Sequence, residues 1–93
     1  AIRHVKVIDE LKRLSTHDDL TGLCNRRLLY RRLEMEMARA QRFEHALGVL
    51  FVDVDHFKQL NDRNGHSVGD AALRGLAAIM TRTVRQVDTL ARI

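Results

Sequence analysis

Two carboxylates stand close together at a place in the sequence where they could bind a metal ion. Asp53 and Asp55 lie at the end of Leu47–Val54, a nearly continuous apolar run that predicts a β-strand buried on both faces. Side chains alternate along a strand, so both carboxylates point to the same face. Their oxygens, at the C-terminal end of a strand, suit a hard divalent cation. The sequence therefore predicts a site for Mg²⁺ (or Mn²⁺).

A short helix predicted over His56–Asp62 would add phosphate-binding groups beside these carboxylates. The first N–H groups of a helix have no intrahelical partner and attract anions, so those of His56, Phe57 and Lys58 would face a phosphate. The Lys58 ammonium adds a positive charge at the same place. Metal, helix N-terminus and lysine together indicate a nucleoside-triphosphate site. The alternative is that the carboxylates only cap the helix and that the lysine is solvated.

Two further polar residues could recognise a purine base. Asn61 lies one helical turn after Phe57, and Asp70 follows a predicted loop that runs from Arg63 to Gly69. Guanine presents N1–H and its amino group to one carboxylate and O6 to an amide donor, which an aspartate and an asparagine would satisfy together. Both residue types are also common in loops, so an ordinary loop role is the alternative.

Three more elements must hold these residues in place. Asn25 is suited to cap a helix that runs to about Phe43, and residues 68 to about 86 repeat apolar side chains at helical spacing. Thr89–Ile93 predicts the start of a second strand. Together these elements indicate an α/β domain, but two strands cannot bury such a core alone. We therefore expect the domain to be cut short just after its second strand begins.

Residues 1–16 carry apolar side chains at three- to four-residue steps, which predicts a helix that needs a partner helix. Such a helix could connect an upstream domain to this one, or it could pack on its own domain. We favour the connector, which leaves residues 17–93 as a separate domain.

Composition excludes several classes of protein. The net charge is +4, but aromatic residues make up only 4% of the 93 residues, too few for a base-stacking surface, so no nucleic-acid partner is expected. A single cysteine, Cys24, excludes an intrachain disulfide and favours a reducing compartment. No apolar run is long enough to span a bilayer. We expect a cytoplasmic location, with any membrane anchor in another region of the parent protein.

Three stretches, in this order, resemble the GGDEF domain of diguanylate cyclases: residues 19–27 (DLTGLCNRR), 51–62 (FVDVDHFKQLND) and 65–73 (GHSVGDAAL). The resemblance covers roughly Leu14–Ile93. It implies an α/β fold, an α+β sandwich related to nucleotidyl cyclases and polymerase palms. It also implies condensation of two GTP into cyclic di-GMP with release of pyrophosphate, at the interface of two domains that each hold one GTP.

The resemblance assigns roles to the candidate residues. Asp53 and the backbone carbonyl of Val54 match the family's metal ligands, Asp53 and Lys58 match catalytic positions, and Asp55 has a supportive role. The family's D-x-L-T-x-L-x-N-R signature would shape the loop beneath the site rather than act in catalysis; its residues here are Asp18, Leu20, Thr21, Leu23, Asn25 and Arg26. The positions that match GTP contacts are His56, Phe57, Lys58, Asn61 and Asp70.

Arg85 and Asp88 form an R-x-x-D pair that ends five residues before the place where the family's own signature would begin. In the family this offset marks the inhibitory site for the product. The guanidinium would bind phosphate or guanine, and the carboxylate would accept from guanine N–H groups. The alternative is an ordinary solvated pair at a helix end.

The Gly-Gly-Asp/Glu-Glu-Phe hairpin is absent from these 93 residues, so we expect an enzyme in the parent protein but no complete active site in this piece. Two alternatives stay open: a catalytically degenerate domain that binds GTP or cyclic di-GMP as a regulator, and a dimerising structural piece. The expected partners are GTP, cyclic di-GMP, a second copy of the domain and an upstream sensory or receiver domain.

Overall fold

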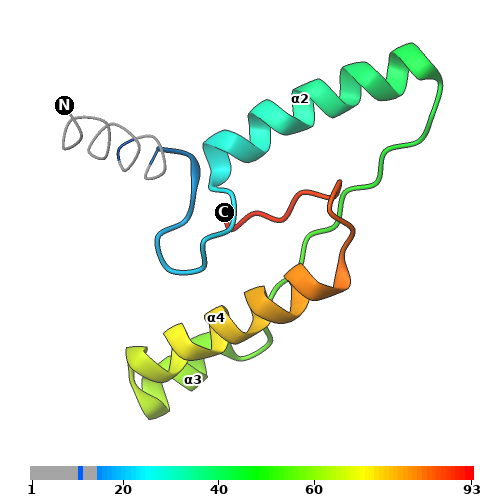
Figure 1. Cartoon of the computed structure of the whole chain (residues 1–93). Coiled ribbons are helices and arrows are strands. Elements are labelled where there is room, and N and C mark those ends of the chain that lie inside the picture. The colour runs from blue at the N-terminus through cyan, green and yellow to red at the C-terminus, as the bar shows by residue number, and fades with distance from the viewer. Residues whose placement is uncertain (1–10, 12–14) are drawn as a thin grey trace.

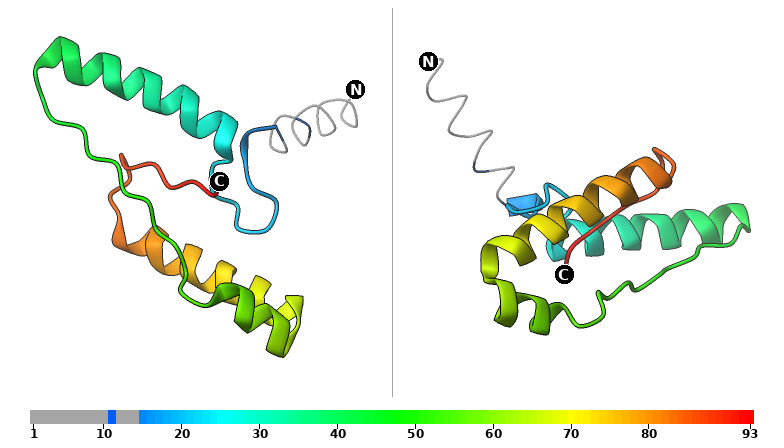
Figure 2. Two further views of the ribbon diagram at one scale, coloured as in Figure 1. Left: turned by 180° about the vertical axis from the view of Figure 1, so that it is seen from behind. Right: turned by 90° about the horizontal axis from the view of Figure 1, so that it is seen from below.

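The computed structural model describes residues 11 and 15–93, and three helices lie wholly within these residues (Figure 1). Helix α2 spans Arg26–Phe43, α3 spans Phe57–Asn64 and α4 spans His66–Thr83. Helices α3 and α4 pack against each other, whereas α2 lies apart from both (Figures 1 and 2). None of the helices in the described part of the chain is long and apolar enough to span a membrane. The helix and the domain boundary predicted at residues 1–16 fall almost wholly outside the described residues and stay predictions.

Helix α2 has the bounds that its capping residue predicts. The Asn25 side-chain oxygen accepts a hydrogen bond from the Leu28 N–H at 3.0 Å, which satisfies one of the free donors of the first turn. At the other end Glu44 adopts a left-handed conformation (φ 56°), and the His45 N–H donates to the Ala40 carbonyl at 3.0 Å. The prediction of a helix capped by Asn25 and ending near residue 43 is confirmed.

Helices α3 and α4 form a hairpin whose connection is a single residue, Gly65. Its φ of 85° lies in the region that glycine occupies without a Cβ penalty, so the chain reverses at one position. The predicted loop from Arg63 to Gly69 is therefore wrong, because α4 already begins at His66. This places Gly69 inside a helix, where glycine is about 1 kcal/mol less favourable than alanine.

The prediction that Leu47–Val54 forms a strand buried on both faces is wrong. The segment is extended but pairs with no strand among residues 15–93, and Leu50 and Phe51 are 91% and 83% exposed. A strand is buried only when neighbouring strands take up its N–H and C=O groups. Residues 88–93 form the other extended segment of the described chain, and they do not pair with Leu47–Val54.

That second segment pairs with Cys24. The Cys24 N–H donates to the Leu90 carbonyl at 3.1 Å, and the Arg92 N–H donates to the Cys24 carbonyl at 2.9 Å, which gives an isolated parallel bridge between Cys24 and Ala91. Cys24 also bridges His17 in antiparallel fashion. The predicted α/β class is thus only partly confirmed, because the described residues contain three helices and isolated bridges but no sheet.

The chain is open and flat. Its radius of gyration is 16.3 Å, against about 12 Å for a compact domain of this length. Among the described residues only Cys24, Gly69 and Ala77 are buried. A groove of about 1120 Å³ runs between α2, the extended segment 47–54 and the apolar face of α4. The apolar side chains that should form a core therefore line this groove instead.

Candidate functional site

The predicted metal and phosphate residues lie where the extended segment turns into α3. His56 has a left-handed backbone conformation (φ 59°, ψ 23°), which is uncommon for a residue with a Cβ and costs about 1–2 kcal/mol. The turn brings the Phe57 N–H back to the Val54 carbonyl, which accepts it at 3.3 Å. Strained backbone of this kind concentrates at functional sites.

The oxygen donors at this turn fit Mg²⁺. Asp53 is exposed and Val54 is half-buried, and both border the groove. The described part of the chain contains no group of three or more His, Cys, Asp or Glu placed to hold a metal. Mg²⁺ does not require one, because it keeps several waters and uses one or two carboxylates together with substrate phosphates. The Val54 oxygen keeps a second lone pair beside its bond to Phe57.

The phosphate-binding groups predicted at the start of α3 are only partly free. The Phe57 N–H is used by Val54 within the turn. The Lys58 side chain is exposed and forms no ion pair within residues 15–93. A phosphate at this helix end would therefore meet the Lys58 ammonium and the remaining first-turn N–H groups.

Of the predicted base-reading residues, Asn61 lies in the contact between α3 and α4, and Asp70 follows that contact by one residue on α4. Asn61 on α3 lies against Gly69, the residue directly before Asp70 on α4. Its Oδ1 is buried and has no hydrogen-bond partner among the described residues. A buried polar atom without a partner costs roughly 1–3 kcal/mol, so packing alone does not explain an asparagine here. The amide and the Asp70 carboxylate thus lie on neighbouring positions of two packed helices.

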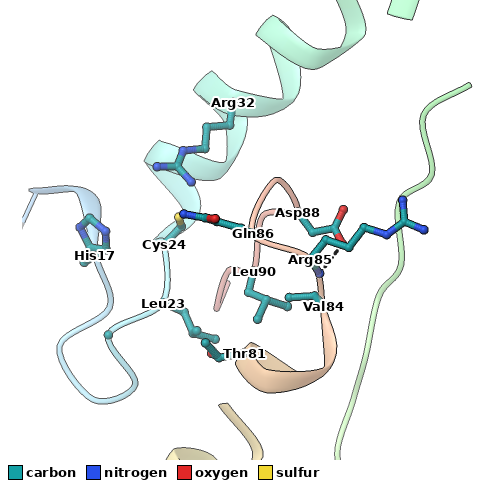
Figure 3. Close-up of a pocket in the computed structure, with 11 residues that line it drawn as sticks. His17, Leu23, Cys24, Arg32, Thr81, Val84, Arg85, Gln86, Asp88 and Leu90 are labelled. Carbon is teal, nitrogen blue, oxygen red and sulfur yellow. Dashed lines mark hydrogen bonds between the residues drawn. The ribbon is translucent and has the colours of Figure 1, made fainter. Parts of the chain in front are cut away.

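Arg85 and Asp88 lie together on the turn that follows α4 (Figure 3). The Asp88 carboxylate accepts from the Arg85 N–H at 2.9 Å, and the Asp88 N–H donates to the Arg85 carbonyl at 3.0 Å. Both residues line a pocket of about 540 Å³ that Arg32 and Cys24 also border. The Arg85 side chain extends away from Arg32 and toward the extended segment (Figure 3). Asp88 therefore shapes the turn, and the Arg85 guanidinium is free to meet a ligand.

A network around Asp18 joins the loop before α2 to the end of the chain. The Asp18 carboxylate accepts from the N–H and the hydroxyl of Thr21, at 2.8 and 2.7 Å, and it pairs with the Arg92 guanidinium at 3.3 Å. Burial raises the pKa of this carboxyl, but the bonds from Thr21 and Arg92 outweigh it and lower the pKa below 3.8. These contacts and the Asn25 cap hold the shape of the loop before α2, while the position of this loop beneath the site stays a prediction.

Replacing Asp18 by asparagine should lower the free energy of unfolding by about 1–3 kcal/mol at pH 7, since hydrogen bonds to a charged group are lost. Because the folded pKa is lowered, this contribution is complete above pH 3.8 and is lost as the pH falls through the folded pKa. Urea denaturation of both forms from pH 7 down to pH 2 measures the effect. A gap between wild type and Asp18→Asn that stays constant over this range would contradict the assignment.

Sequence reasoning missed two residues, Arg92 and Gly69. Arg92 meets Asp18 across 74 positions, a pairing that a single sequence does not reveal. Gly69 carried a signal that was not used, because an isolated glycine within a helical pattern points to close packing. It was assigned to a loop instead.

Residues 15–93 match the family model described as "Diguanylate cyclase, GGDEF domain". The chain belongs to the GGDEF family. The resemblance seen in the three motifs is thereby confirmed, and it extends over nearly all of the described residues of this GGDEF chain.

Several curated relatives are similar to this GGDEF chain. It is 45% identical over 84 residues to the bifunctional diguanylate cyclase/cyclic di-GMP phosphodiesterase MucR of Pseudomonas aeruginosa, a match that covers 90% of the chain and 12% of MucR. It is 40% identical over 85 residues to the diguanylate cyclase DgcP of the same organism, covering 91% of the chain and 13% of DgcP. The GGDEF chain therefore spans only a small part of these relatives.

Two solved structures share its fold. A truncated form of TpbB from Pseudomonas aeruginosa that comprises only the GGDEF domain matches with a TM-score of 0.80 at 40% identity, over 83% of this chain and 45% of that one. The coiled coil and GGDEF domain of DgcB from Caulobacter crescentus, solved in complex with c-di-GMP, matches with a TM-score of 0.80 at 29% identity, over 97% and 47%. The GGDEF fold is thus confirmed, although the described residues contain little of its sheet.

Proposed function

We propose that this chain is part of a diguanylate cyclase domain that condenses two GTP into cyclic di-GMP. The observation that carries the proposal is the contact between α3 and α4, which lays Asn61 against the residue before Asp70. An amide and a carboxylate from different helices there form a complementary pair for the edge of guanine. The family to which the chain belongs supports the same activity. A second copy of the domain would hold the second GTP, and an upstream sensory or receiver domain would set the geometry of the pair.

Each part of the site would then have one task. Asp53 and the Val54 carbonyl would hold Mg²⁺, which when bound neutralises phosphate charge. Lys58 and the N-terminus of α3 would bind the triphosphate, and Asn61 with Asp70 would orient the base. The 3′-oxygen of each GTP attacks the α-phosphorus of the other. Two new O–P bonds replace the two bonds to pyrophosphate, so two pyrophosphates leave and the two hydroxyl protons pass to solvent.

The proposal is tested by incubating the full-length protein with GTP and Mg²⁺ and following cyclic di-GMP and pyrophosphate by chromatography. Cyclic di-GMP and pyrophosphate in a ratio of 1:2 are expected. ATP in place of GTP should give no cyclic dinucleotide. Absence of product together with absence of GTP binding would reject the proposal.

A second candidate is a regulatory module that binds cyclic di-GMP, favoured by the turn of Arg85 and Asp88 beside the pocket of about 540 Å³. Replacing Arg85 by alanine should weaken cyclic di-GMP binding about 10- to 100-fold, the equivalent of losing hydrogen bonds from a charged donor. Isothermal titration calorimetry of the full-length protein measures the dissociation constant.

The matched control is Arg27→Ala, which removes an exposed arginine of α2 that does not border the pocket. Tight binding of cyclic di-GMP with no GTP turnover would make this second function the protein's activity. Equal affinities of wild type and Arg85→Ala would exclude the turn as the binding site.

A further inference from the structure

Helix α4 contains two glycines whose surroundings differ sharply. Neither Gly69 nor Gly75 has a positive φ, so the backbone conformation requires glycine at neither position. A Cβ added at Gly75 would meet nothing within 4 Å. A Cβ added at Gly69 would lie 2.7 Å from the Cγ and 3.2 Å from the Nδ2 of Asn61. The space at Gly69 is therefore taken by the Asn61 side chain.

The position of Asn61 in this space is energetically unfavourable for its amide oxygen. The Oδ1 is buried there without a hydrogen-bond partner among the described residues. A shorter or apolar side chain would fill the same contact without an unpaired polar atom. A helix glycine and an unpaired amide thus meet in one contact, and each is unfavourable alone. Departures from the usual rules of helix composition and hydrogen bonding, when they occur together at one place, are typical of functional sites.

We propose that Gly69 is a positioning residue for Asn61 and thereby determines base selectivity. Without a Cβ at position 69, the amide fits into the contact between α3 and α4 against Gly69, one residue before Asp70. With a Cβ, the amide is displaced, and only the carboxylate is left to read the base. The inference rests on the proposed function, in which Asn61 and Asp70 contact guanine.

The first test compares Gly69→Ala with Gly75→Ala, the same substitution on the same helix in open space. Urea denaturation should show a lower midpoint for Gly69→Ala and an equal or higher one for Gly75→Ala, since alanine favours the helix. If Gly69→Ala does not fold, the same substitution is made in Asn61→Ala. There it should no longer lower the midpoint, because the clashing side chain is gone. A midpoint that falls as far in that background would overturn the proposal.

The second test uses base selectivity, which a merely structural role would not move. Dissociation constants of the full-length protein for GTP and ATP are measured by calorimetry. Gly69→Ala should lower the preference for GTP over ATP about tenfold, and Gly75→Ala should leave it unchanged. An unchanged preference in Gly69→Ala would overturn the role in selectivity. If the wild type binds neither nucleotide, the proposed function fails, whereas the coupling of residues 61 and 69 is still decided by the denaturation experiment.

Discussion

Replacing Asp53 by asparagine is expected to lower cyclic di-GMP formation by the full-length protein about 1000-fold. Asparagine keeps the shape of the side chain but removes the charge that would hold Mg²⁺ at the turn before α3. Loss of metal-assisted charge stabilisation raises the barrier by several kcal/mol, and each 1.36 kcal/mol is a factor of ten in rate. Initial rates at saturating GTP over a Mg²⁺ titration measure the effect.

Asp62→Asn is the matched control, because it removes an exposed carboxylate of α3 by the same substitution. It should leave the rate within about twofold of wild type, as surface substitutions away from special features have small effects. Asp53→Asn should also leave the urea midpoint near that of the wild type, since Asp53 is exposed and accepts no hydrogen bond from residues 15–93. A rate that survives Asp53→Asn would remove this residue from the metal site.

Replacing Asp70 by asparagine is expected to lower the preference for GTP over ATP about 10- to 100-fold. The carboxylate would accept from both N1–H and the amino group of guanine, and an amide presents a donor to one of them. A paired contact to a base edge is worth about 1–3 kcal/mol of discrimination. Competition binding with GTP, ITP and ATP on the full-length protein measures the change.

ITP makes this experiment specific, because inosine keeps N1–H and O6 but lacks the amino group of guanine. The wild type should bind GTP more tightly than ITP, and Asp70→Asn should bind the two about equally. A uniform loss of affinity for all three nucleotides would show that Asp70 supports the fold rather than reads the base.

Local features of the structure were predictable from sequence. The Asn25 cap fixes the start of α2 because its partner, the Leu28 N–H, lies three residues away. The turn that carries Asp53, Val54 and Lys58 is also only a few positions long, but the joint role of these residues stays a prediction. Helical periodicity also indicated α4, although its first residue lies earlier than expected.

Features that depend on distant residues were not predictable. The apolar character of Leu47–Val54 indicated a buried strand, yet burial depends on partner strands that residues 15–93 do not supply. The pairing of Asp18 with Arg92 joins the two ends of the described chain. Gly69 was placed in a loop because glycine and asparagine are common there, whereas the packing of α3 on α4 decides its role.

The unpaired segment Leu47–Val54 also determines which backbone amides lack protection against hydrogen exchange. No backbone N–H of Leu47–Val54 donates to another backbone group of the described chain, whereas the amides of α4 are held in its helix. In a chain limited to these residues, the amide hydrogens of this segment should therefore exchange with solvent deuterium without any opening reaction. Asp53 lies at the end of this segment, so a metal ion bound there would restrict the motion of the backbone. That loss of chain entropy would lower the apparent metal affinity wherever nothing else holds the segment in place.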